Sequence, residues 1–158
     1  MNEAIQLAKL SEMSGEVPVG GVLVFDNKII AKDYNRVIEL NDPTAHAELL
    51  VLRHGGKILE NYRLLDTILY VTLEPCLMCL TAMINARIKT LVYSAKDPKK
   101  GVFSTNLYNE VKKVYNHKIE ILSGIYEEVS SDIIKSFFKE RRDAGVVERG
   151  GLENRYPS

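Results

Sequence analysis

The stretch Thr67-Ile68-Leu69-Tyr70-Val71-Thr72-Leu73-Glu74-Pro75-Cys76-Leu77-Met78-Cys79 decides how the rest of the chain is interpreted. Its first residues are β-branched, aromatic or apolar, which is typical of a buried strand. Glu74-Pro75 breaks that run, and helical spacing resumes from Cys76 to Ala86. The stretch therefore predicts a strand, a turn and a helix whose first turn carries two cysteines.

Cys76 and Cys79 are the only cysteines in the chain. Three residues apart at a helix start, they lie on one face, where the partial positive charge of the helix N-terminus lowers the pKa of a thiol. Upstream, His46 adds an imidazole to these two thiols, and zinc prefers both kinds of ligand. Three protein ligands leave the fourth tetrahedral position to water, which is typical of catalytic zinc sites. We therefore predict a zinc site of His46, Cys76 and Cys79.

Other residues near this pattern leave alternatives open. His54 lies eight residues along the predicted helix from His46, about 12 Å, which is too far for one ion. His117 stays open as a fourth ligand, which would make the site a structural zinc module without catalysis. A thioredoxin-like thiol pair without metal is a second alternative. Glu48 would point about 200° away from His46 on a helical wheel, so we do not expect it to be a ligand.

Helical and strand periods alternate along the whole chain, which predicts an α/β sandwich. Asp26-Asn27 tolerates the positive φ of a hairpin turn, Asp42-Pro43 is typical of a helix start, and Gly55-Gly56 is typical of a helix end. The predicted helices are Glu3 to Met13, Asp42 to His54, Leu107 to Val114 and about Tyr126 to Arg142. The further predicted strands are Val19 to Phe25, Lys28 to Asp33, Thr90 to Ser94 and Ile119 to Ser123.

Length and charge limit the class of protein. The 158 residues suit one domain, which we expect to cover residues 1–142, with a flexible tail at 143–158. No apolar stretch suits a membrane span and no secretory signal is present, so we expect no membrane partner and a cytoplasmic location. Lys plus Arg and Asp plus Glu are 21 each, but residues 86–118 carry eight basic and two acidic residues, a net charge of +6. This basic segment predicts a local phosphate-binding face.

The two halves of the metal pattern also form a known signature. His46-Ala47-Glu48 and Pro75-Cys76-Leu77-Met78-Cys79 match the His-x-Glu and Pro-Cys-x-x-Cys motifs of zinc-dependent nucleobase deaminases. Over about residues 3 to 142, the chain resembles the bacterial tRNA adenosine deaminases within the cytidine and deoxycytidylate deaminase superfamily. The loop Gly101 to Thr105 is less similar. The flanking shared stretches are Gly15 to Gly20, Asn35, Asp42 to Glu48, Asn61 to Leu64, Ala86 to Ile88, Asp97 to Lys99, Asn116-His117, Phe137-Phe138 and Arg141-Arg142.

The resemblance implies a fold and a reaction. The fold would be a three-layer α/β/α sandwich of the cytidine deaminase type, with a central mixed five-stranded sheet and helices on both faces. In the reaction, a zinc-activated water would attack C6 of the wobble adenosine of a tRNA anticodon, with Glu48 as the catalytic proton carrier, giving inosine and ammonia. Deaminases of free guanine, cytosine or cytidylate share the catalytic pattern and remain an alternative.

The resemblance also implies substrate contacts and partners. Asn35 would contact the flipped nucleoside, Val19 would help to form the base pocket, and the backbone N–H of Ala47 would hold the base. Asp97 and Asn116 would lie along the groove for the anticodon loop, with Asp97 pairing with a ribose hydroxyl. The expected assembly is a homodimer with one zinc ion per subunit, bound to a tRNA anticodon stem-loop.

Overall fold

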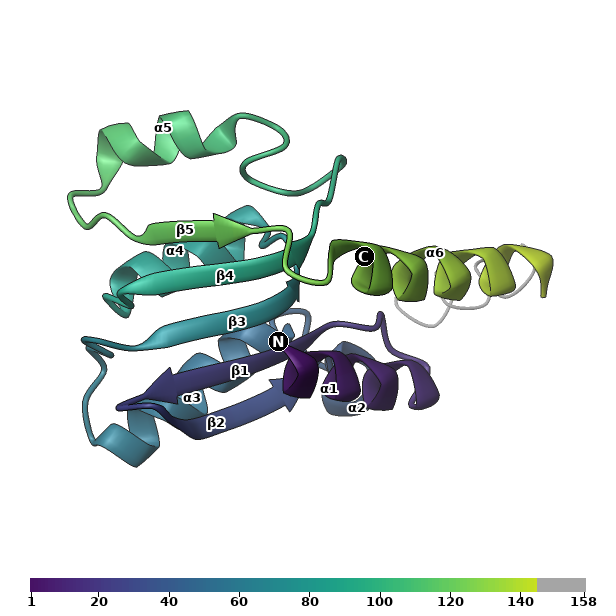
Figure 1. The fold of residues 1–158 in the computed structure, drawn as a ribbon, viewed down its shortest axis with the longest axis horizontal. Helices are drawn as coiled ribbons and strands as arrows, with labels where there is room; N and C mark the ends of the chain where they lie inside the picture. The colour runs from purple at the N-terminus through teal and green to yellow at the C-terminus, as the bar shows by residue number, and fades with distance from the viewer. Residues whose placement is uncertain (145–158) are drawn as a thin grey trace.

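The computed structural model describes residues 1–144, which form a five-stranded sheet with helices on both faces (Figure 1). The strand order is β2-β1-β3-β4-β5. β1 (Gly20–Phe25) runs antiparallel to both β2 (Lys28–Tyr34) and β3 (Ile68–Leu73). β4 (Thr90–Ala95) and β5 (Glu120–Ser123) continue parallel to β3. The mixed five-stranded sheet expected from the resemblance is confirmed.

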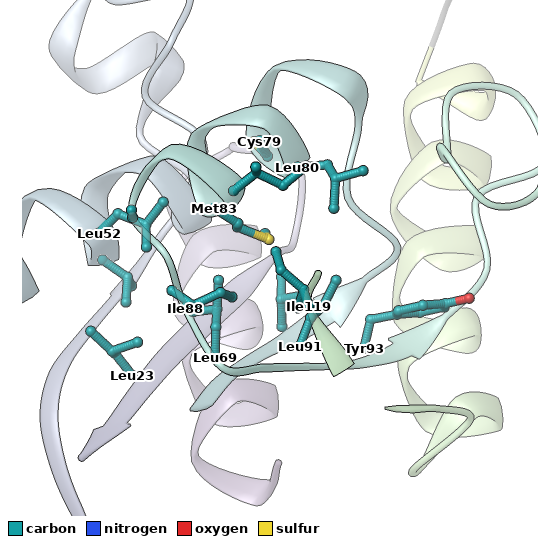
Figure 2. Packing of buried hydrophobic residues seen from close by; sticks show 14 of the residues in the cluster. Leu23, Leu52, Leu69, Cys79, Leu80, Met83, Ile88, Leu91, Tyr93 and Ile119 are labelled. Carbon is teal, nitrogen blue, oxygen red and sulfur yellow. The ribbon is translucent and has the colours of Figure 1, made fainter. Parts of the chain in front are cut away.

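The helices form two layers because neighbouring residues of a strand point to opposite faces. Val22 packs against Ala4 and Leu7 of α1, whereas Leu23 belongs to the main core on the other face. In that core, strand residues Leu23, Leu69 and Leu91 lie beneath Leu80 and Met83 of α4 (Figure 2). The sheet is thus the middle layer of three. The helices are α1 (Asn2–Met13), α2 (Val37–Leu40), α3 (Ala47–Leu59), α4 (Leu77–Asn85), α5 (Leu107–Val114) and α6 (Glu127–Asp143).

The parallel strands give the sheet two distinct ends, one where these strands begin and one where they finish. The carboxyl ends of β3 and β4 lie side by side, since Leu73 pairs with Ala95. We call this end the site edge, because the segments that leave it carry Cys76 and Asp97. The opposite end, where Ile68 pairs with Thr90 and Thr90 pairs with Glu120, is called the far edge. Ligands of open α/β sheets bind outside the carboxyl ends of the strands, which here is the site edge.

The predicted bounds of the second helix were wrong at both ends. Asp42 does not cap a helix, because its Oδ1 accepts hydrogen bonds from the N–H and O–H groups of Thr44, at 2.8 and 2.6 Å, in a local turn. The helix α3 therefore begins only at Ala47. Gly55 does not end it, because a side chain there would collide with Leu23, so this glycine serves close packing of the helix on the sheet. The sequence did not predict α2, a single turn in which no residue is buried.

The last described helix, α6, ends at Asp143, one residue beyond its predicted end. The predicted flexible tail falls almost wholly on residues 145–158, which lie outside the described residues. None of the helices within residues 1–144 has the length and apolar character needed to cross a membrane.

Candidate metal centre

The three predicted ligands come together at the site edge. His46 immediately precedes α3, Cys76 immediately precedes α4, and Cys79 lies in the first turn of α4. The His46 Nδ1 atom lies 3.4 Å from the Cys79 sulfur and 3.7 Å from the Cys76 sulfur. All three candidate ligand atoms lie within 4.8 Å of one another. The N-termini of two helices, α3 and α4, thus bring one imidazole and two thiols close together.

The spacing of these atoms fits one tetrahedral ion. With bonds of about 2.3 Å to sulfur and 2.0 to 2.1 Å to nitrogen, a sulfur and a nitrogen on one tetrahedral zinc lie about 3.5 Å apart. The two observed nitrogen-sulfur distances, 3.4 and 3.7 Å, bracket that value. Cys79 is fully buried, while His46 and Cys76 are partly exposed, so the cluster has one open side. The donor set is compatible with a metal site that a small molecule can reach.

The two thiols differ in their acidity. The pKa of Cys76 falls to about 4, chiefly because its sulfur interacts by a hydrogen bond with Cys79, and also because it interacts with His46. The pKa of Cys79 is raised, because it shares that hydrogen bond with Cys76 and because it is buried. One sulfur is therefore held in the thiolate form that binds metal ions.

Glu48 lies beside the cluster in the first turn of α3 and is almost fully buried, with 4% of its surface exposed. Burial raises the pKa of its carboxyl group to about 7, although the nearby Cys79 thiol and His46 imidazole oppose part of that rise. The helical-wheel argument does not apply to this pair, because His46 has an extended backbone with φ −71° and ψ 149° and lies outside the helix. Glu48 is not among the three grouped candidate ligands.

The other two histidines make contacts elsewhere. His54 Nε2 lies 2.9 Å from Oδ2 of Asp33, and His117 Nε2 lies 2.7 Å from the carbonyl oxygen of Ile88 at the far edge. Neither belongs to the His-Cys-Cys cluster. The fourth protein ligand that a closed structural site would need is therefore not supplied by His117 in this structure.

Three predicted substrate contacts lie next to the cluster. The Oδ1 atom of Asn35 accepts a hydrogen bond from the backbone N–H of Ala47 at 2.8 Å, and both residues are buried. The backbone N–H of Asn35 donates to the carbonyl oxygen of Val19 at 3.1 Å. The Ala47 N–H, which the resemblance assigns to the base, is thus engaged by Asn35. The Asn35 amide nitrogen is the group left to donate to a ligand.

The two predicted groove residues lie at opposite ends of the strands, one at the site edge and the other at the far edge. Asp97 follows β4 at the site edge, and its Oδ1 accepts the backbone N–H groups of Lys99 and Lys100, both at 3.1 Å. Asn116 precedes β5 and neighbours His117, which contacts Ile88 at the far edge. Six strand residues separate these edges, or roughly 20 Å.

The basic residues on either side of β4 are divided in the same way. Lys96, Lys99 and Lys100 follow β4, at the site edge. Arg87 and Lys89 precede the same strand, at the far edge. A strand carries its two flanking loops to opposite ends of the sheet, so the basic residues of 86–118 fall into two groups, and their binding to phosphates stays a prediction.

Sequence reasoning missed one buried group at the site edge. Glu74 was interpreted as part of a break between strand and helix, but its carboxylate is buried and accepts two hydrogen bonds from Ser104. An acidic residue after a strand and before a proline signals a turn, and nothing in that local pattern points to a partner thirty residues away.

Comparisons with known proteins agree with this geometry. A family model described as MafB19-like deaminase matches residues 1–142. The tRNA-specific adenosine deaminase of Haemophilus influenzae is 43% identical over 155 residues, which cover 98% of this chain and 90% of that protein. The chain belongs to this deaminase family. The tRNA-specific adenosine deaminase of Buchnera aphidicola subsp. Baizongia pistaciae is 51% identical over 144 residues, 90% of this chain and 88% of that protein.

A solved structure of the deaminase family has the same fold. It comes from structural studies of A-to-I editing by tRNA:A34 deaminases at the wobble position and superposes with a TM-score of 0.81 at 42% identity. The match covers 84% of this chain and 96% of that one. Membership of the deaminase family therefore rests on sequence and fold together, over nearly all of the described residues.

Proposed function

We propose that this chain is a tRNA adenosine deaminase, which hydrolyses the wobble adenosine of an anticodon to inosine and ammonia. The observation that carries the proposal is a His-Cys-Cys cluster with a buried carboxyl group beside it, in a chain that is 43 to 51% identical to tRNA-specific adenosine deaminases. We assign the deaminase domain to residues 1–142. A tRNA substrate is consistent with a cytoplasmic location.

In this proposal, His46, Cys76 and Cys79 would hold one Zn²⁺ ion per subunit. Zinc bound there would lower the pKa of a water molecule toward 7 and make it a nucleophile at neutral pH. Glu48 would take a proton from the attacking water and deliver it to N1 of adenine. It would then take the remaining proton of the hydroxyl added at C6 and pass it to the amino group, which leaves as ammonia while C6 becomes the carbonyl carbon of inosine. The Glu48 pKa of about 7 suits a group that both accepts and donates protons at neutral pH.

The neighbouring residues would orient the base. Asn35 is fixed by its bond to Ala47, so its amide N–H₂ group would meet the nucleoside without first having to be ordered. Val19 is buried, and its carbonyl oxygen accepts a hydrogen bond from the backbone N–H of Asn35. This position beside Asn35 suits an apolar wall of the base pocket. An anticodon loop is already single-stranded, so extruding its base into such a pocket is less costly than in a duplex.

We further infer that the working form is a homodimer whose RNA groove draws on both copies. Asp97 and Asn116 lie at opposite edges of one sheet, roughly 20 Å apart along a strand. One chain cannot easily line a single narrow groove with both residues. Two copies could do so if the far edge of one lies beside the site edge of the other.

Inosine formation on an anticodon stem-loop with adenosine at the wobble position tests the function. Ammonia release would be measured in parallel on guanine, cytosine and cytidylate, each with and without a zinc chelator. We expect chelator-sensitive turnover of the stem-loop alone. Turnover of a free base or nucleotide instead would favour the alternative substrate class, and turnover of none would contradict a deaminase.

The variant Glu48→Gln tests the role of Glu48 in the reaction, because it removes the carboxyl group but preserves the size of the side chain. We expect it to keep its zinc and to lose a factor of about 10² to 10⁴ in kcat. Glu39→Gln, an exposed glutamate of α2, should have the turnover of the unaltered protein. A Glu48→Gln protein with its zinc and full activity would exclude Glu48 as the proton carrier.

A further inference from the structure

The loop of residues 97–106 leaves β4 at the site edge and folds back over the turn that precedes α4. The backbone N–H of Val102 donates to the carbonyl oxygen of Pro75 at 3.1 Å. The Ser104 hydroxyl donates to Oε1 of Glu74 at 2.6 Å, and the Ser104 backbone N–H donates to Oε2 at 3.2 Å. The loop is therefore attached directly to the two residues that lead into Cys76.

Glu74 is a rigid attachment point. The residue is 3% exposed, and its backbone N–H donates to the carbonyl oxygen of Ala95 at 2.8 Å. A buried carboxylate is costly unless it is hydrogen-bonded, and the short bond from Ser104 has the length of a charge-assisted one. Gly101 passes so close to this carboxylate that a side chain there would collide with it. The carboxylate and the loop backbone are fitted to each other.

The same loop carries charged groups at the site edge. Lys99 and Lys100 are exposed, and their backbone N–H groups both bind Oδ1 of Asp97. The N–H of Gly101 donates to the carbonyl oxygen of Asp97 at 2.9 Å. The two lysines thus lie on a turn whose position depends on where Gly101 and Ser104 are held.

Phe103, the residue before Ser104, is anchored independently of Glu74, and Thr105, the residue after it, is bonded within the loop. The Phe103 ring stacks on Tyr93 at 5.4 Å between centroids and meets Tyr108 at 4.9 Å. The Thr105 hydroxyl donates to the carbonyl oxygen of Gly101 at 2.6 Å. Loss of the Ser104 hydroxyl should therefore loosen the loop locally and leave the fold intact.

We propose that Ser104 is a positioning residue for the RNA substrate: by binding Glu74 it fixes the 97–106 loop so that Lys99 and Lys100 face a nucleotide chain entering the metal site. This inference rests on the proposed function and deepens it. The lysines would bind phosphates next to the extruded base, and the Ser104–Glu74 contact would keep the loop in its binding form before RNA arrives. Ordering the loop in advance strengthens binding without changing the chemical step.

The test compares Ser104→Ala, which loses the hydroxyl, with Ser104→Thr, which keeps it. Ser14→Ala is the control, because Ser14 is another exposed serine but its hydroxyl, at the end of α1, donates to the backbone carbonyl oxygen of Leu10 and not to a carboxylate. For each protein, kcat and KM on the stem-loop and zinc content would be measured. The rate of trypsin cleavage after Lys99 and Lys100 would be followed by mass spectrometry. The cleavage measurement requires no substrate, so it reports on the loop even if the proposed function is wrong.

If about one loop in ten remains in its binding form, Ser104→Ala should raise KM about tenfold while kcat stays within about twofold. Trypsin should cut its loop faster, zinc content should be unchanged, and Ser104→Thr and Ser14→Ala should behave as the unaltered protein. Faster cleavage with an unchanged KM would overturn the role in RNA binding. Unchanged cleavage would show that the Ser104–Glu74 contact does not hold the loop. A fall in kcat that parallels zinc loss would show an effect on the metal site instead.

Discussion

The side-chain oxygen of Asn35 accepts a hydrogen bond from the backbone N–H of Ala47 at 2.8 Å. Because the partner is a donor, this bond fixes which end of the Asn35 amide is oxygen and leaves its N–H₂ group to donate. It also ties the end of β2 to the start of α3, across the segment that contains α2 and leads to His46. One side chain thus links a residue that we propose to contact the nucleoside to the histidine of the candidate metal cluster.

Two substitutions at Asn35 separate these roles. Asn35→Asp keeps the oxygen acceptor at the N-terminus of α3, where a negative charge is favourable, but loses the amide donor. We expect it to keep its zinc and thermal stability and to lose at least about tenfold in kcat/KM, the value of one hydrogen bond to the substrate. Asn35→Ala should also lower the free energy of unfolding by about 1 to 2 kcal/mol. Unchanged kcat/KM in Asn35→Asp would mean that the amide does not contact the nucleoside.

Metal content tests the three proposed ligands directly. We expect one zinc ion per chain by elemental analysis, with loss of zinc and activity together when a chelator is added. Cys79→Ser should bind zinc much more weakly, because a hydroxyl is a poorer zinc ligand than a thiolate. His54→Ala and His117→Ala are matched controls that should keep zinc, since these histidines contact Asp33 and Ile88. Zinc loss in His117→Ala would restore the closed structural site as an explanation.

Adjacent glycines in α3 offer a test of the packing. At Gly55 an added methyl group would collide with Leu23 in the core, whereas at Gly56 its nearest neighbour would be the Asn61 carbonyl oxygen at 3.5 Å. We expect Gly55→Ala to lower the free energy of unfolding by about 1 to 3 kcal/mol, as overpacking does. Gly56→Ala should gain up to about 1 kcal/mol from helix propensity. Urea unfolding of both variants would check this, and equal stabilities would contradict the close packing.

These glycines also show where sequence reasoning stops. Local signals predicted the hairpin at Asp26-Asn27 and the whole of α5, because turn chemistry and helical period act over a few residues. The Gly55-Gly56 pair was interpreted as a helix end, since its real cause, the close approach of Leu23, is a tertiary contact. The candidate metal cluster was predictable because its ligand types and spacing are themselves the signal. The Glu74–Ser104 contact was not predictable, since nothing in the sequence around either residue points to the other.

The two-copy groove makes a prediction that one-chain grooves do not. Asp97→Ala and Asn116→Ala should each lower turnover of the stem-loop, because each removes one wall contact of the same groove. If that groove combines Asp97 of one copy with Asn116 of the other, a mixed dimer has one doubly altered groove and one unaltered groove. Such dimers, made with a different affinity tag on each chain and purified through both tags, should recover about half of the unaltered activity. If each groove lay within one chain, every groove of the mixed dimer would carry one defect, and activity would stay at the level of the single variants.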